Sequence, residues 1–380
     1  ELQDTATRLL GEWMSIEAGP VLAGAALGAG CNADRDAAAP ASHGGGKAAF
    51  TPVKWKMVTT WPKNFPGLGT GANYLAELIT AMSGGRIEVK VFGANELVPA
   101  FEVFGAVSAG TAELGHGASY YWKGKSEAAQ FFSAVPFGLT AEEMNAWLYH
   151  GGGMELWAET YQPFGLVPLA AGNTGVQMAG WFNREINSLE DLQGLKMRIP
   201  GLGGEVLARA GGTPVSLPGG ELFTSLQSGA IDATEWVGPY NDLAFGLYKA
   251  ARYYYYPGWH EPGTTLECMV NRQAFDALPE ELQIIVSNAA RVANQDMYAE
   301  YIARNNQALQ TLVEEHQVEV RKLPDPVLAR LRDLSAQVVE EIAAKDALSK
   351  RVYESFQRFR QQATQWSNIS QRAYLNARSV

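Results

Sequence analysis

The most constraining feature of this 380-residue sequence is a repeated switch between strand-like and helix-like hydrophobic patterns from residue 51 onward. Residues 51–60 alternate with a period of two, 71–82 have helical spacing, and 87–92 alternate again. Helical patterns follow at 101–109 and at 141–160, where a triple glycine interrupts them. This order predicts helices packed on a mixed or parallel sheet.

The alternation restarts at Asn173, which predicts a second lobe of the same kind. Its expected strands are 176–182, 195–199 and 231–237, and its expected helical segments are 188–193, 203–210 and 220–228. Two long helical regions follow, at 279–315 and 327–376. Such long helices must bury an apolar stripe against the lobes or against another copy of the chain.

Composition limits the classes of partner. The chain is 47% hydrophobic and 18% charged, so it has the residues for a large core. Its formal net charge of -10 and the lack of Lys/Arg clusters argue against nucleic-acid binding. An acidic protein that binds an anion needs a local positive group, since its overall field repels the ligand. After residue 50 no run of about 18 apolar residues predicts a membrane span.

The first 48 residues have the order of an export signal. An apolar run at 21–30 ends at Cys31, and an Ala/Pro/Gly-rich stretch follows to Gly46. This order predicts a signal, a lipid-modified Cys31 and a flexible tether, although the acidic start and Gly28 depart from the usual lipoprotein signal. Ordinary cleavage and a disordered leader stay open as alternatives. Cys268 lies in an apolar run and is expected to be a buried hydrophobe.

Four segments carry glycines, aromatics and isolated polar groups at the expected ends of strands, where ligand sites gather in α/β folds. They are 116–122, 173–181, 195–201 and 232–240, the last followed closely by 253–261.

Arg198 is the strongest candidate for a ligand contact. It stands in an otherwise apolar strand, so its guanidinium is expected to be desolvated and to need an anion. A guanidinium matches a carboxylate through two parallel hydrogen bonds. That carboxylate is either a ligand's or a protein side chain's, such as that of Glu235.

Oxygen-bearing side chains in and beside the same segments are candidate ligands for a cation. Gln177, Glu235 and Glu261 offer hard oxygen ligands, although each is also a common hydrogen-bonded structural group. Aromatic side chains in the same segments either wall a pocket or pack in the core: Tyr120, Tyr121, Trp236 and 253–256.

Signals for catalysis are weak. The sequence has no Gly-x-Ser-x-Gly elbow, no His-Glu-x-x-His, no Walker-type phosphate loop and no paired-cysteine metal site. His116, His150 and His260 lack nucleophile-base spacing.

Taken in order, these segments resemble one family. They are Tyr120-Tyr121, Asn173-Thr-Gly-Val-Gln-Met178, Leu195-Lys-Met-Arg198, Asp232-Ala-Thr-Glu-Trp-Val-Gly-Pro-Tyr240 and Tyr253-Tyr-Tyr-Tyr-Pro-Gly-Trp259. The set is similar to the solute-binding proteins of tripartite ATP-independent periplasmic (TRAP) transporters, and most similar to the branch that binds 2-oxo acids. The similarity runs from about Val53 to the C-terminal helices.

The resemblance implies a site. Arg198 would bind the substrate carboxylate, with Tyr120 and Tyr121 contacting the substrate from the facing lobe. A sodium or calcium ion, bound by a set of oxygen donors, would also touch the substrate. The implied metal ligands are Gln177, Glu235, Glu261 and the backbone oxygen of Trp236, and Gln177 and Trp236 also contact the substrate. His260 departs from the resemblance, because tryptophan is expected there, and this bears on the size and preference of the pocket.

The resemblance also implies an α/β, two-lobed periplasmic binding protein fold with long C-terminal helices. We expect a leader at 1–48, lobe I at 49–171 plus about 264–304, lobe II at 172–263 plus about 305–326, and C-terminal helices at 327–380. The expected partners are a small carboxylate such as pyruvate, the membrane permease subunits of a TRAP transporter, and a second copy in a homodimer. The expected location is the periplasm, with no enzymatic role. An enzyme acting on a small oxo or hydroxy acid and a ligand sensor stay open as alternatives.

Overall fold

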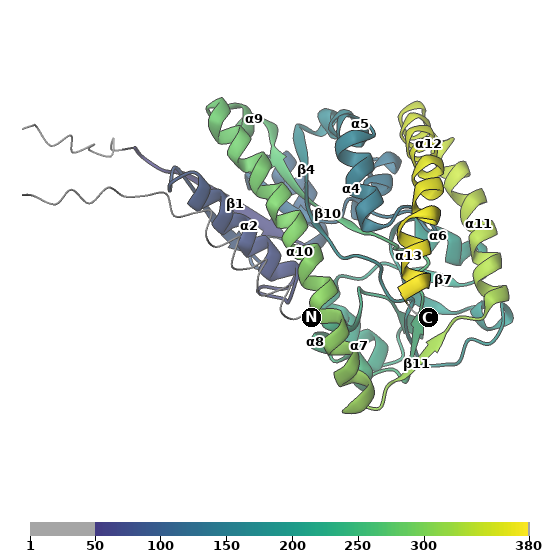
Figure 1. Ribbon diagram of the computed structural model, residues 1–380. Helices are drawn as coiled ribbons and strands as arrows, with labels where there is room; N and C mark the ends of the chain where they lie inside the picture. The colour runs from purple at the N-terminus through teal and green to yellow at the C-terminus, as the bar shows by residue number, and fades with distance from the viewer. Residues whose placement is uncertain (1–49, 379–380) are drawn as a thin grey trace, which may run out of the picture. The chain divides into compact units, whose positions relative to one another are not determined.

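The computed structural model describes residues 50–378 of the chain, so the predicted leader and Cys31 lie outside the described residues. The described part contains two separate β-sheets with helices packed on them (Figure 1).

The first sheet has the strand order β2-β1-β3-β10-β4. Its strands are β1 (Val53–Thr59), β2 (Ile87–Phe92), β3 (Leu114–Gly117), β4 (Leu166–Asn173) and β10 (Thr265–Asn271). Strand β1 pairs in parallel with β2 and β3, whereas β10 runs antiparallel between β3 and β4. The chain therefore returns to this sheet through β10 after it has formed most of the second one.

The second sheet has the order β11-β9-β5-β8-β6-β7. Its strands are β5 (Gly180–Phe182), β6 (Lys196–Arg198), β7 (Thr213–Val215), β8 (Ala233–Thr234), β9 (Tyr253–Tyr256) and β11 (Glu319–Lys322). Strand β5 is antiparallel to β8 and β9, and β6 is parallel to β7 and β8. Arg198 and Glu235 therefore stand at the same edge of this sheet, where β6 and β8 end.

Helices cover both sheets. The α-helices before the C-terminal region are α2 (Leu68–Met82), α3 (Val103–Ser108), α4 (Ala141–His150), α5 (Gly153–Tyr161), α6 (Gly201–Arg209), α7 (Leu222–Gln227), α8 (Pro239–Phe245), α9 (Arg272–Asp276) and α10 (Glu280–Glu314). Short 3-10 helices are η1 (Ala100–Glu102), η2 (Ser119–Trp122), η3 (Glu127–Phe132), η4 (Gln162–Phe164), η5 (Glu190–Leu192), η6 (Gly219–Glu221) and η7 (Leu247–Lys249). The 35-residue helix α10 packs on β4 of the first sheet and on α2, and it also contacts α8, the helix that follows β8 of the second sheet (Figure 1). No described helix has both the length and the apolar character required to cross a membrane.

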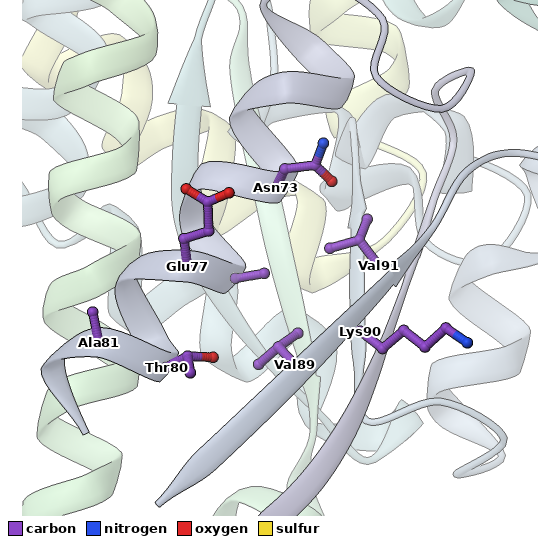
Figure 2. Close-up of a pocket in the computed structure, with 8 residues that line it drawn as sticks. Asn73, Glu77, Thr80, Ala81, Val89, Lys90 and Val91 are labelled. Atoms are coloured by element: carbon purple, nitrogen blue, oxygen red, sulfur yellow. The ribbon is translucent and has the colours of Figure 1, made fainter. Parts of the chain in front are cut away.

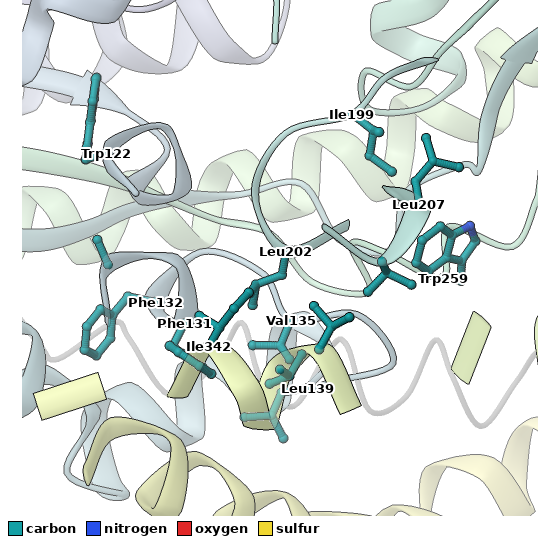
Figure 3. Packing of buried hydrophobic residues seen from close by; sticks show 14 of the residues in the cluster. Trp122, Phe131, Phe132, Val135, Leu139, Ile199, Leu202, Leu207, Trp259 and Ile342 are labelled. Atoms are coloured by element: carbon teal, nitrogen blue, oxygen red, sulfur yellow. The ribbon is translucent and has the colours of Figure 1, made fainter. Parts of the chain in front are cut away.

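The last three helices are α11 (Asp325–Ala343), α12 (Ala347–Ile369) and α13 (Gln371–Arg378). Helix α11 packs on α6, and α12 packs on α4, α5 and η3. Figure 3 shows Ile342 of α11 beside Phe131 and Val135 in the largest apolar cluster.

An aromatic stack joins α12 to the rest of that cluster. The ring of Phe132 lies between those of Trp147 and Trp157, with centroid distances of 5.6 and 5.2 Å. Phe356 of α12 meets Trp147 edge-on at 5.2 Å and is fully buried. Burying an aromatic side chain of this size stabilises the fold by about 1.5–3 kcal/mol. The first half of α12 is thus part of the core.

Several predicted elements differ in extent. The expected strand 176–182 is shortened to β5, because the backbone N–H of Gln177 donates to the Glu261 carbonyl at 3.2 Å instead of joining the sheet. The expected strand 231–237 is reduced to β8, after which the chain turns into α8. The single helical region 327–376 is divided into three helices. Asp346 accepts a hydrogen bond from the Ser349 N–H at 2.7 Å and caps α12 after α11, and a second break at Ser370 separates α12 from α13.

Candidate binding site

The predicted site residues come from loops at the ends of strands in both sheets. Arg198 ends β6, Glu235 follows β8, and Gln177 lies between β4 and β5. Glu261 follows β9, and Tyr121 belongs to η2 after β3. All except Tyr121 are buried, and Tyr121 is half-buried.

All three nitrogens of the Arg198 guanidinium have a partner. Its Nε donates to the Leu217 carbonyl at 3.1 Å, its Nη1 forms an ion pair with the Glu235 carboxylate, and its Nη2 donates to the Tyr121 hydroxyl at 3.1 Å. The guanidinium also lies 5.0 Å from the ring centroid of Trp236. Burial lowers the pKa of Arg198, but the Glu235 carboxylate and the nearby tyrosines outweigh it, so the pKa lies above its usual value. Arg198 is therefore a permanent buried cation, and the structure shows the pairing with Glu235 that the sequence left open.

Glu261 lies next to this pair in a hydrogen-bonded loop. Its Oε2 accepts from the Gln177 amide at 2.8 Å and from the Thr264 hydroxyl at 2.6 Å. Burial, and then the charge of Glu235, raises the pKa of Glu261 well above its ordinary value. Gly258 allows the loop to approach Gln177, because a Cβ on Gly258 would lie 2.2 Å from the Gln177 carbonyl oxygen.

Three buried oxygens at this place have no hydrogen-bond partner among the described residues: Gln177 Oε1, Glu235 Oε2 and Glu261 Oε1. Leaving a buried acceptor unpaired costs about 1–3 kcal/mol, so three together are unusual. Glu235 and Glu261 also offer ligand atoms that lie, together with one from His260, within 4.8 Å of one another. Carboxylate and amide oxygens are the donors that hard cations prefer, so the oxygens of Gln177, Glu235 and Glu261 fit a sodium or calcium ion.

A small cavity of about 10 Å³ adjoins these groups. Its lining comes from elements of both sheets: Trp61, Leu68, Tyr120, Tyr121, Thr174, Gln177, Trp236, Val237, Thr264 and Leu266. The Trp61 and Trp236 rings meet edge-on at 6.1 Å, which closes the apolar side. A space of this size holds about one water molecule, so the side chains or lobes must move before an organic acid enters.

A larger cavity lies elsewhere in the described residues. It measures about 550 Å³ and is formed between α2 and β2. Figure 2 shows Asn73 and Glu77 of α2 on one side and Val89 and Val91 of β2 on the other. None of the predicted site residues lines it.

Other residues in the same segments have structural roles. The run 253–256 forms β9, and the Tyr254 hydroxyl donates to buried Asp242 at 2.7 Å, as core packing predicts.

Thr264 was not predicted, although its hydroxyl orients both Gln177 and Glu261. A threonine outside a motif gives no sequence signal for such a role.

Comparison with known proteins gives the class of protein that this fold and site define. The family of bacterial extracellular solute-binding proteins, family 7, matches residues 57–346, and the chain belongs to that family.

Relatives in this family share most of the chain. A monocarboxylate 2-oxoacid-binding periplasmic protein of Nostoc sp. (strain PCC 7120) is 46% identical over 330 residues, which are 87% of this chain and 90% of that protein. A TRAP solute-binding protein from Colwellia psychrerythraea, solved with calcium and pyruvate, is 44% identical with a TM-score of 0.84; the match covers 86% of this chain and 100% of that one. Another from Pseudoalteromonas atlantica, solved with sodium and pyruvate, is also 44% identical, with a TM-score of 0.83 and coverages of 86% and 99%.

These likenesses confirm the fold class and the family predicted from the sequence, an α/β periplasmic binding protein with long C-terminal helices. The chain is an extracellular solute-binding protein, a class of transport protein.

Proposed function

We propose that this chain is the periplasmic solute-binding component of a TRAP transporter and that it captures a small 2-oxo monocarboxylate such as pyruvate together with a cation. The observation that carries the proposal is the set of three unpaired buried oxygens beside the paired guanidinium of Arg198. The relatives that bind 2-oxo acids or hold pyruvate with calcium or sodium support the same chemistry.

A 2-oxo acid suits these groups because its carboxylate and adjacent carbonyl chelate one cation. Glu235, Glu261 and the ligand bring three negative charges together, which is costly without compensation. Arg198 and the bound cation supply the compensating positive charge. The Nη2 of Arg198 carries two hydrogens and donates one to Tyr121, so the second is suited to a ligand carboxylate oxygen.

The proposed roles follow from these contacts. Arg198, Tyr120, Tyr121, Gln177 and Trp236 would contact the substrate. Gln177, Glu235, Glu261 and the backbone oxygen of Trp236 would hold the cation, which is sodium in our first choice and calcium in the alternative.

Two lobes that open around this site would admit the acid. We assign lobe I to 49–171 with about 264–304 and lobe II to 172–263 with about 305–326, on the support of the two sheets. The narrow cavity between Tyr120 and Trp236 then corresponds to a closed arrangement, and hinge motion opens it.

Calorimetry on metal-free protein tests the proposal. We expect pyruvate to bind stoichiometrically when sodium or calcium is added, and at least about tenfold more weakly without either. We further propose that the acid is bound and not converted, so mass spectrometry should recover pyruvate unchanged after prolonged incubation. If pyruvate binds equally well without a cation, Glu235 and Glu261 have structural roles only. If a product of pyruvate appears, the enzyme alternative is favoured.

The remaining partners are proposals of the same kind. The loaded protein would deliver its acid to membrane permease subunits, and tethering through a lipidated Cys31 stays a prediction. A homodimer is supported by an apolar surface near the C-terminal end, where Trp366, Ile369 and Tyr374 are 68%, 75% and 64% exposed.

A further inference from the structure

His260 lies beside the proposed cation ligands Glu235 and Glu261 without a hydrogen-bond partner among the described residues. Its side chain is 1% exposed, and neither Nδ1 nor Nε2 has a partner among the described residues. Its Nε2 lies 3.5 Å from Glu235 Oε2, which is itself unpaired. A buried imidazole with two unpaired nitrogens is a group for which the fold alone gives no reason.

The backbone fixes the place of this imidazole. The Trp259 carbonyl accepts from the Phe137 N–H at 2.8 Å, and the Glu261 N–H donates to the Gly258 carbonyl at 3.2 Å. Gly203 packs so closely that a Cβ there would lie 2.9 Å from the His260 Cβ. The side chain is thus presented to the site on a rigid segment, as metal ligands generally are.

The distances suit a shared metal ion. Two ligand atoms each about 2.1 Å from a metal are about 3 Å apart at 90° and about 4.2 Å apart at 180°. The 3.5 Å between His260 Nε2 and Glu235 Oε2 falls inside this interval. Glu261 completes a group of three residues whose ligand atoms lie within 4.8 Å of one another.

We infer that His260 is a nitrogen ligand of the cation and that this site therefore prefers a divalent transition metal such as Zn²⁺ over Ca²⁺ or Na⁺. The inference rests on the proposed function, which places a cation between Glu235 and Glu261. Imidazole nitrogen is a good ligand for Zn²⁺ and its neighbours in the first transition series, whereas Ca²⁺ and Na⁺ take oxygen ligands. An ion pair between a protonated His260 and Glu235 is the competing explanation, and it predicts no preference for zinc.

Metal titrations separate the two explanations. Zinc chloride and calcium chloride are titrated separately into metal-free full-length protein, with and without pyruvate, for the wild type, His260→Gln and His150→Gln. His150 is exposed on α4 and serves as the matched control. We expect the wild type to bind one Zn²⁺ at least about tenfold more tightly than Ca²⁺. His260→Gln should lose that preference while its Ca²⁺ affinity stays within about threefold, because a glutamine oxygen suits Ca²⁺.

Zinc-edge X-ray absorption of the wild type provides a second readout that needs no variant. With one equivalent of Zn²⁺ we expect imidazole scattering, retained in His150→Gln and lost in His260→Gln. If the wild type binds Ca²⁺ and pyruvate but shows no zinc preference or no imidazole signal, the ligand role of His260 is wrong and the proposed function stands. If neither metal ions nor pyruvate bind, the proposed function itself fails. Should His260→Gln not fold, the wild-type affinities and spectrum alone decide.

Discussion

Two sets of buried carboxylates in this protein differ in how their oxygens are paired. Glu267 in β10 is fully buried, with one oxygen accepting from the Trp122 indole at 2.5 Å and the other from the Tyr161 hydroxyl at 2.7 Å. Glu235 and Glu261 are equally buried, yet each keeps one oxygen without a partner. Burial alone therefore does not mark the candidate site; the grouping of several buried oxygens without partners does.

Asp242 supports the same distinction. It is a buried residue of α8, and its Oδ2 accepts from the Trp181 indole at 3.0 Å and from the Tyr254 hydroxyl at 2.7 Å. Burial raises the pKa of Asp242 and that of Glu267 to about 7. Like Glu267, Asp242 is a buried carboxyl group with hydrogen-bond partners and a structural role. Both differ in this from Glu235 and Glu261 beside Arg198.

The largest expected effect comes from removing the positive centre of that cluster. In Arg198→Ala the acid loses its guanidinium partner, and breaking a desolvated ion pair costs about 3–5 kcal/mol. We expect pyruvate affinity to fall by about 100-fold or more in calorimetry at saturating cation. Thermal unfolding should still be cooperative but at a lower temperature, because the buried carboxylate of Glu235 loses its ion-pair partner. Near-normal affinity in this variant would end the assignment of Arg198 to the ligand.

A matched pair of isosteric changes tests the comparison directly. Glu235→Gln removes the negative charge of a proposed cation ligand, whereas Glu267→Gln changes a paired structural carboxyl of the same size. We expect Glu235→Gln to weaken the dependence on cation, because a neutral amide attracts a cation less than a carboxylate does, so that the ratio of pyruvate affinities with and without cation falls by at least about tenfold. In Glu267→Gln that ratio should stay within about twofold of the wild-type ratio. Equal behaviour of the two variants would show that pairing does not separate the two classes.

Local sequence patterns predicted the elements well where a single segment determines its own structure. The predicted strand 87–92 coincides with β2, and the predicted helix 279–315 differs from α10 by one residue at each end. Pro279 and the acidic residues Glu280 and Glu281 mark the start of that helix in the sequence itself.

The sequence predicted which types of residue form the site, but it did not predict which of these residues pair with one another. Arg198 in an apolar strand required an anion, but only the fold shows that Glu235 supplies one. The shortening of β5 depends on bonds between Gln177 and a loop some 80 residues away, which no local pattern contains. Thr264 was not predicted for the same reason, and His260 had no motif spacing to mark it as a ligand.

The pH dependence of stability offers a smaller effect. Burial raises the pKa of Glu267 from 4.5 to about 7, so the folded state keeps a proton that the unfolded state releases above pH 4.5. The resulting stabilisation is complete below pH 4.5 and is lost as the pH rises through 7. Between pH 5 and 8 we expect the unfolding free energy of the wild type to fall by about 2–3 kcal/mol relative to Glu267→Gln. Denaturant titrations at the two pH values measure this difference, and parallel changes in both proteins would contradict it.

The smallest expected effect on binding concerns the end of α12, where exposed apolar side chains follow buried ones along the same helix. Phe356 is fully buried in the core, but Trp366 and Ile369 of the same helix are 68% and 75% exposed. Large apolar side chains grouped on a surface often mark an interface between proteins. If they meet a second copy of the chain, the double variant Trp366→Ser, Ile369→Ser should shift light scattering across a dilution series from dimer toward monomer, with pyruvate affinity unchanged within about twofold. Ile302→Ser on α10, where the side chain is 59% exposed, is the matched control and should leave the mass unchanged. A wild-type chain that stays monomeric at high concentration would disprove the homodimer without affecting the assignment of the binding site.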